Sequence, residues 1–284
     1  MKNYASLIEH LNLFDENLTK MIESNRLLHP EQREEYANKI AECFIPCAKK
    51  ILAGCFLVKN LKGGEQVVRK INPTVLELYY HEEDPGRFKD PIMYHTNDRK
   101  YYDYYLDANG KEKSHGPQSQ SFFKKRGIDG LPYYPIGSLN PHTSGIDITF
   151  ENSEKHYRAS CLIREYDILF AEGKEPVHIK NSTDIYDDLL LYGITLDNAD
   201  WIDWEPGDCL DSVSDKDFKE KHSCGRRNVP DYIPSDVVIE GCPVLWKKND
   251  HPDGEPAFAG PNKKVYKKCP FNWQFHKAEI PPKK

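Results

Sequence analysis

Apolar residues recur at helical spacing near the start of the chain. Within residues 3–27 they stand three or four positions apart, as one buried helix face requires: Leu7, Ile8, Leu11, Leu13, Phe14, Leu18 and Ile22. Helices are therefore predicted at residues 3–27, 30–44 and 47–53. Gly54 is expected to end the third of these helices, because glycine readily terminates a helix.

Strands are predicted where aliphatic and β-branched residues run together between turn-forming residues. They span residues 55–58, 66–71, 74–80, 145–150, 157–164, 237–240 and 243–247. The clearest hairpin joins 145–150 to 157–164, with odd-numbered and even-numbered residues on opposite faces. A long polar stretch at 81–138 and a short helix at 185–192 complete the pattern. It indicates one α+β domain with a mainly antiparallel sheet flanked by helices.

Length and composition indicate a globular protein with a polar surface. The chain has 284 residues, a hydrophobic content of 38% and a mean hydropathy of −0.73. Its apolar runs are too short to span a bilayer, and its first ten residues lack the apolar core of a secretory signal. The eight cysteines include no CxxC pair, which favours ordinary thiols over zinc ligands. We expect a cytoplasmic protein that does not contact a membrane.

Charge is distributed unevenly along the chain. The net charge of −6 argues against broad binding to nucleic acid. Residues 184–220 hold twelve acidic residues against two lysines, so the remainder of the chain carries a net charge of +4. Basic clusters at 124–126, 226–227 and 263–268 leave room for one basic face.

One acidic residue stands in the middle of an apolar strand. Residues 73–80 are rich in β-branched, aliphatic and aromatic side chains, and Glu77 interrupts them. A carboxylate in such surroundings is costly unless it has a partner or a chemical task. General-base catalysis is such a task. The alternative is that Glu77 faces solvent on an edge strand.

Several common functional motifs are absent from the sequence. It contains no Walker loop, no GxGxxG, no GxSxG and no HExxH. The acidic residues at 197–208 lack the oxygen spacing and central glycine of an EF-hand loop. No lysine or cysteine stands out as a covalent nucleophile. We expect neither a metal nor a cofactor.

Several short segments of the sequence, here called sequence blocks, match the motifs of one enzyme family in the same order. In order, they are residues 48–58, 75–79, 83–86, 94–96, 144–151 and 162–165. Glu77 and Tyr79 match the family's catalytic strand, and Arg164 matches the arginine that ends its return strand. The colinear match covers residues 48–247, and in it the chain resembles the alkyladenine (3-methyladenine) DNA glycosylase family.

The resemblance implies a curved sheet and a task for each matched residue. Glu77 would activate the water that attacks C1′ of the sugar. Arg164 would lie beside Glu77, where it tunes the carboxylate or holds a phosphate. Tyr79 and His95 would stack on the extruded base, with His81 as a second candidate histidine. Because no amine nucleophile is indicated, the bond would be hydrolysed without strand nicking.

Two family positions hold different residues in this chain. Glu151 occupies the position of the pocket asparagine that screens out guanine, so purine selection is expected to differ. Ser144 occupies the position of the tyrosine that fills the emptied base stack. His142 is the candidate to replace that tyrosine, with Tyr133 and Tyr134 as alternatives.

The sequence thus predicts a monomeric DNA-repair hydrolase that releases an alkylated or deaminated purine from DNA. Residues 1–45 are expected to form a helical extension and residues 46–250 the glycosylase-like domain. Residues 251–284 are expected as a peripheral C-terminal extension, packed on the domain or partly disordered. Two alternatives are an inactive nucleic-acid-binding module on the same scaffold, and an unrelated protein whose interaction face is the acidic stretch 184–220.

Overall fold

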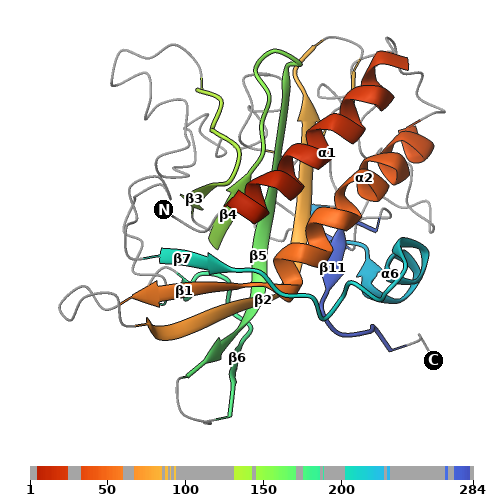
Figure 1. The fold of residues 1–284 in the computed structure, drawn as a ribbon. Coiled ribbons are helices and arrows are strands. Elements are labelled where there is room, and N and C mark those ends of the chain that lie inside the picture. Colours follow the sequence, from red (N-terminus) through yellow and green to blue (C-terminus); the bar gives the residue numbers. More distant parts are fainter. Residues whose placement is uncertain are drawn as a thin grey trace, which may run out of the picture.

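The computed structural model describes most of the helices and strands that the sequence pattern predicts (Figure 1). The described residues are 5–24, 33–59, 67–84, 87–88, 90, 93, 131–142, 145–170, 175–185, 188, 202–226, 229–230, 266–267 and 272–281. The strands predicted at 237–240 and 243–247 lie outside them. So does the helix predicted at 185–192, apart from residues 185 and 188.

Two N-terminal helices, α1 (Ala5–Ser24) and α2 (Arg33–Ala53), lie against each other across one face of the sheet (Figure 1). The separate helices predicted at 30–44 and 47–53 are one helix, with Pro46 in its interior. Proline removes a helix hydrogen bond, but the burial of its neighbours outweighs that loss. Those neighbours are at most 1% exposed: Phe44, Ile45, Cys47 and Ala48.

Helix α2 ends at Ala53, as predicted from Gly54. Gly54 also permits a close approach, since a Cβ at this position would lie 2.2 Å from the ring of Trp204. Strand β1 (Cys55–Lys59) can therefore begin directly beside this indole. The domain boundary expected between residues 45 and 46 falls inside α2.

The described strands form a curled, antiparallel sheet. Its main path runs β3-β4-β5-β2-β1-β7, with β6, β8 and β11 attached to it. Beyond β1, the strands are β2 (Val67–Glu82), β3 (Ser138–His142), β4 (Gly145–Thr149), β5 (Tyr157–Leu169), β6 (Val177–Ile179), β7 (Ile202–Glu205), β8 (Ser223–Cys224) and β11 (Gln274–His276). A separate pair joins β9 (Val229–Pro230) to β10 (Tyr266–Lys267).

Strand β2 is one continuous strand where two were predicted, at 66–71 and 74–80. Pro73 lies in its middle, where the register with β5 shifts between Pro73 and Val75. Proline has no N–H for the ladder and is tolerated in a sheet at such irregularities. The long β2 lies between β5 and β1 in the sheet, and it also pairs with β11.

The predicted hairpin is present as β4 and β5, with the expected alternation. Ile146 and Ile148 lie in the hydrophobic core, together with Tyr157 and Ala159 of the return strand. Strand β5 continues to Leu169, beyond the predicted end at residue 164. It is longer because its second half pairs with the first half of β2.

Residues 274–276 of the expected C-terminal extension form strand β11 of the sheet, so this part is packed on the domain and is not peripheral. Strand β11 pairs with β2 on one side and β8 on the other. Trp273 and Phe275 are fully buried in the core. Tertiary pairing places this strand, because a three-residue strand has too few local contacts to form alone.

Among the described residues, six of the twelve acids in the acidic stretch 184–220 form ion pairs with basic residues of the same chain. The stretch contains β7 and a helix that was not predicted, α6 (Asp215–His222), which packs on α2. The six pairs are Asp188–Arg69, Asp203–Lys59, Glu205–Lys70, Asp211–Lys50, Asp215–Lys49 and Asp217–Lys221. These pairs weaken the alternative in which the stretch serves as an acidic interaction face.

The two sides of the sheet centre differ in chemistry. On the helix face, which α1 and α2 cover, stand Leu76, Leu78, Tyr80, Ala159, Cys161 and Ile163. On the polar face, which points the other way, stand Glu77, Tyr79, His81, Asp147, Thr149, Arg158, Ser160 and Arg164. The predicted α+β domain with a curved, mainly antiparallel sheet flanked by helices is confirmed. In the described part of the chain, no helix has the length and apolar character needed to cross a membrane.

Candidate active site on the polar face of the sheet

Glu77 lies at the centre of the polar face and is fully buried. Its Oε2 accepts hydrogen bonds from Nε of Arg164 at 2.6 Å and from the hydroxyl of Tyr79 at 3.0 Å. Its Oε1 accepts one from Nε2 of Gln274 at 2.7 Å. Glu77 is therefore not on a solvent-facing edge, and its carboxylate is held from both sides.

Arg164 is adjacent to Glu77, as expected from the resemblance. It forms a 2.6 Å ion pair with Glu77, and its side chain is 18% exposed. Burial acts to lower the pKa of Arg164, but Tyr79 and Glu77 outweigh it and raise this pKa above its ordinary value. The guanidinium therefore stays protonated and holds a positive charge against the carboxylate.

Tyr79 is a neutral hydrogen-bond donor to Glu77. Burial, together with the charge of Glu77, raises the pKa of Tyr79 well above its ordinary value. The guanidinium of Arg226 lies 4.7 Å from the centre of its ring, and the ring belongs to a small apolar cluster with Met93 and Leu162. A base that stacks on Tyr79 would have to enter between these side chains, because the residue is 9% exposed.

Arg226 and Asp90 form a second buried ion pair next to Tyr79. Nη1 of Arg226 lies 2.8 Å from Oδ2 of Asp90, and both side chains are fully buried. Nδ1 of His81 lies near the backbone of Asp90, so this candidate histidine is part of the same group. Because Arg226 contacts the Tyr79 ring, the group supports the ring from one side.

Glu151 belongs to a third group, which is separate from the contacts of Glu77. Its Oε2 accepts from the backbone N–H of Tyr134 at 2.8 Å and lies 3.3 Å from Nη1 of Arg158. Arg158 is fully buried, pairs with Glu83 at 2.7 Å, and lies 4.0 Å from the ring centre of Tyr133. The structure thus gives Glu151 a buried cationic partner, and places Tyr133 and Tyr134 in this group.

The candidate histidine His95 and the position Ser144, where the family has a tyrosine, lie outside the described residues. The backbone of His142 ends β3, opposite Gly145, but its side chain is outside the described part. The structure therefore brings together Glu77, Tyr79 and Arg164 of the predicted set.

Gln274 was not predicted as a site residue. It lies 197 positions from Glu77 in the chain, so no local pattern links the two residues. A strand signal was present, because Trp273 and Phe275 alternate with Gln274 and His276. Arg226 was missed as a site residue too, although it lies in the basic cluster 226–227.

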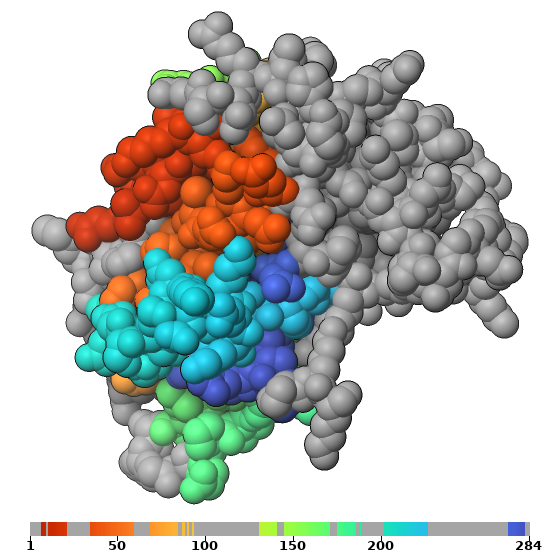
Figure 2. Space-filling model, turned by 90° about the vertical axis from the view of Figure 1, so that its right-hand side faces the viewer, coloured from red at the N-terminus to blue at the C-terminus, as the bar shows by residue number. Residues whose placement is uncertain are grey.

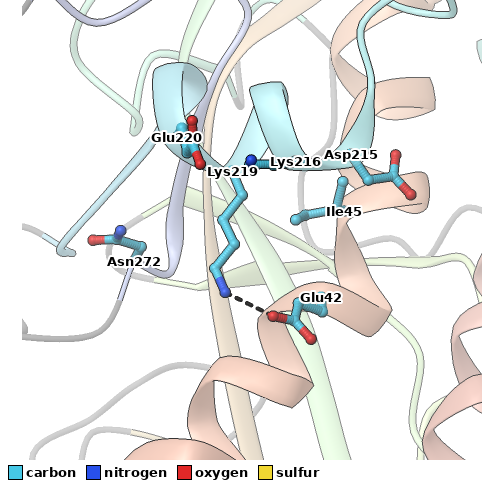
Figure 3. Close-up of a pocket in the computed structure, with 7 residues that line it drawn as sticks. All are labelled: Glu42, Ile45, Asp215, Lys216, Lys219, Glu220 and Asn272. Carbon is cyan, nitrogen blue, oxygen red and sulfur yellow. Dashed lines mark hydrogen bonds and ion pairs between the residues drawn. The ribbon is translucent and has the colours of Figure 1, made fainter.

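A surface pocket of about 520 Å³ lies between α2 and α6, away from the predicted site residues. Figure 3 shows its lining, with an ion pair from Lys219 to Glu42 across it. The remaining lining residues are Ile45, Asp215, Lys216, Glu220 and Asn272. In Figure 2, the segment that contains α6, coloured cyan, lies on the face toward the viewer, below the orange residues of α2. With acids and lysines mixed along its wall, the pocket does not select one ligand charge.

The described cysteines are all free thiols: Cys43, Cys47, Cys55, Cys161, Cys209 and Cys224. Burial and the charge of Glu42 raise the pKa of Cys43 to about 11, so its thiol is protonated near neutral pH. Among the described side chains, no group of three or more His, Cys, Asp or Glu is arranged to hold a metal ion.

Comparisons with known proteins do not assign the chain to a family. No protein-family model, no curated protein and no solved structure matches it. The resemblance to the alkyladenine DNA glycosylases therefore rests on the sequence blocks alone.

Proposed function

We propose that the protein hydrolyses the N-glycosidic bond of a modified purine in DNA, with Glu77 as the base that activates water. The observation that carries the proposal is the arrangement of Glu77, Tyr79 and Arg164. A buried carboxylate held by a permanent cation and a neutral phenol keeps one orientation, which a general base requires. The three residues are also among those that the sequence blocks single out.

The proposed reaction needs few groups. Water attacks C1′ of the sugar as the C1′–N bond to the purine breaks, and the purine departs with the electron pair of that bond. Glu77 accepts the proton of the water, and its negative charge stabilises the positive charge that develops on the sugar. The purine takes up a proton from solvent. Arg164 fixes the carboxylate throughout, and the strand stays intact.

The burial of Glu77 restricts how water and the substrate can approach its carboxylate. Because Glu77 is fully buried while Arg164 is 18% exposed, water and the sugar would approach beside Arg164. The extruded nucleotide would have to displace the side chains above the carboxylate. Base extrusion costs a few kcal/mol, and contacts to the phosphates would have to supply this energy.

A second candidate is a module that binds nucleic acid without cleaving it. The same burial favours this candidate, because both oxygens of Glu77 already accept hydrogen bonds within the protein. Glu151 also favours it, since its partner Arg158 engages it in a separate group. In this case, the Glu77 cluster is a structural part of the sheet.

The test is a paired assay on duplexes that contain alkylated adenine, hypoxanthine or ethenoadenine. Wild type is expected to produce alkali-labile sites, and Glu77→Gln to lower the single-turnover rate about 10²–10⁴-fold. Glu205→Gln, an exposed glutamate paired with Lys70, is the matched control and should retain the wild-type rate. Thermal unfolding of each variant checks that it is folded.

The outcomes separate the candidates. If wild type and Glu77→Gln both leave these duplexes intact, the enzymatic proposal is wrong for these substrates. Binding that weakens steeply with salt would then support the non-cleaving module, because phosphate contacts release counterions. Binding that is absent at low salt would support neither candidate and favour an unrelated function.

A further inference from the structure

Gln274 links the buried carboxylate of Glu77 to a thiol and an imidazole on neighbouring strands. Its Nε2 donates to Oε1 of Glu77 at 2.7 Å. Its Oε1 accepts from the thiol of Cys224 at 3.2 Å and lies 3.1 Å from Nε2 of His276. Gln274 is fully buried, whereas Cys224 is half-buried. Both ends of the amide are thus engaged in hydrogen bonds.

The chemistry of these partners fixes the orientation of the amide. A carboxylate only accepts hydrogen bonds, so the NH₂ end of Gln274 must face Glu77. The carbonyl end then faces Cys224 and His276 and needs donors. The Cys224 thiol supplies one donor, and His276 supplies a second in the tautomer that carries a hydrogen on Nε2. A flipped amide would set two acceptors, Oε1 of Gln274 and Oε1 of Glu77, against each other.

The backbone around Gln274 is also fixed. Gln274 stands opposite Glu77 in the ladder to β2 and opposite Cys224 in the ladder to β8. Its neighbours Trp273 and Phe275 are fully buried on the helix face, and Nε1 of Trp273 donates to the backbone of α2 at Ala37. A functional group must be held within about 0.5 Å of its working position, and side chains on strands are held more precisely than side chains on loops.

We infer that Gln274 is a positioning residue of the candidate active site. It sets the orientation of the Glu77 carboxylate, while Cys224 and His276 set the orientation of its amide. Arg164 and Tyr79 hold one carboxylate oxygen, and Gln274 holds the other. The inference about orientation stands on geometry, and its consequence for catalysis rests on the proposed function.

The first experiment measures the amide itself and requires no enzymatic activity. In protein labelled with ¹⁵N-glutamine, the side-chain NH₂ signal of Gln274 is identified by its loss in Gln274→Met. In wild type, this signal should exchange slowly with solvent. In Glu77→Leu, exchange should accelerate about tenfold or more, because one hydrogen bond to a charged acceptor is lost.

A matched pair of variants tests the carbonyl end of the amide. Cys224→Ala combined with His276→Phe removes both donors and should shift the Gln274 NH₂ signal. Cys224→Ser retains a donor and should leave the signal close to its wild-type position. If Glu77→Leu and the double variant both leave the signal and its exchange unchanged, Gln274 does not position Glu77 and the inference is wrong.

The second experiment measures base release in single turnovers. Gln274→Met should lower the rate constant of the chemical step about 10²-fold while DNA affinity stays the same, because a misplaced base costs that much. Phe275→Leu, which alters the same strand on its helix face, is the structural control. Its folded fraction should release the base with the wild-type rate constant. Equal losses in both variants would indicate that β11 acts only through stability.

The two experiments fail independently. If wild type releases no base, the proposed function is wrong, and the NMR experiment still decides whether Gln274 holds Glu77. If wild type releases base and Gln274→Met does so at the same rate, the positioning inference is wrong and the proposed function stands.

Discussion

The two faces of the central sheet bury their side chains by different means. The helix face packs aliphatic and aromatic groups under α1 and α2, and its stability comes from apolar area removed from water. The polar face buries carboxylates against arginines in three groups centred on Glu77, Asp90 and Glu151. A buried ion pair gains little net stability, because the desolvation of both charges offsets their attraction.

The difference indicates where function is to be sought. A sheet needs one apolar face to fold, and the helix face supplies it. The polar face adds buried charges that apolar residues of similar size would replace without loss of stability. Three such groups gather on the polar face, whereas the helix face has the pair Glu82–Arg87. This concentration of buried charge is the physical reason to place the candidate site on the polar face.

The largest loss of unfolding free energy is expected from a substitution on the helix face. Phe44 is fully buried and its ring contacts the rings of Phe14, Phe150 and Phe275. Phe44→Ala should lower the free energy of unfolding by about 4 kcal/mol, through lost burial and a cavity. Urea unfolding measures this loss. A value below about 1 kcal/mol would contradict the assignment of this face as the stabilising one.

A slightly smaller effect is expected when one partner is removed from an ion pair of the polar face. Arg226→Met leaves the charge of Asp90 buried without its cation and should cost about 3 kcal/mol. Adding Asp90→Leu to the same variant should recover much of that loss, because no charge then remains to be stabilised. If the double variant is less stable than Arg226→Met by a further 3 kcal/mol, the pair is a source of stability and the contrast between the faces fails.

A polar group on the helix face gives an intermediate effect. The hydroxyl of Tyr36 donates to Oε1 of Glu82 at 2.6 Å, beneath α2, and accepts from Arg87. Tyr36→Phe should cost about 2 kcal/mol, the usual value for a buried hydrogen bond to a charged group. Tyr166→Phe, which removes a hydroxyl bound to the less buried Asp188, should cost less. Equal losses of unfolding free energy in the two variants would show that the burial of the carboxylate acceptor does not determine how much each hydroxyl contributes.

The smallest effect is a pH-dependent one at Asp15 of α1. Burial acts to raise the pKa of Asp15, but hydrogen bonds from Lys155, Tyr157 and Asn152 outweigh it and lower the pKa below its ordinary value of 3.8. A lowered pKa stabilises the folded protein above the unfolded-state pKa, and this stabilisation is lost as the pH falls through the folded-state pKa.

Asp15→Asn should therefore lower the stability of the protein near neutral pH by less than about 1 kcal/mol, since solvent screens the half-buried carboxylate. The difference from wild type should shrink as the pH falls below about 4 and vanish at lower pH. Urea unfolding at pH 7 and pH 3 measures it. A difference that grows on acidification would contradict the assigned contacts.

Patterns within single segments predicted much of the fold. The alternation of residues 145–150 predicted that Asp147 lies opposite Ile146 and Ile148, and the structure confirms it. The alternation of residues 157–164 predicted that Arg164 lies opposite Tyr157 and Ala159, and this is confirmed as well. The local pattern wrongly predicted that a helix is interrupted at Pro46 and a strand at Pro73. The burial of neighbouring side chains and strand pairing override the tendency of proline to end such elements.

The candidate site was predictable only in part. Arg164 lies beside Glu77, as expected, because the two residues stand on the paired strands β5 and β2. The partners Gln274 and Arg226 were not predicted. They come from segments distant in sequence, and no periodicity links such segments.

The sequence by itself determined the alternating faces of residues 145–150 and 157–164, and that Glu77 stands among apolar neighbours in the strand now described as β2. Side-chain alternation along a strand is a local property, so the chain encodes it directly. Only the tertiary structure decided that Glu77 is buried and which donors hold it. Those contacts join β2, β5 and β11, and they exist only once the sheet has brought these strands together.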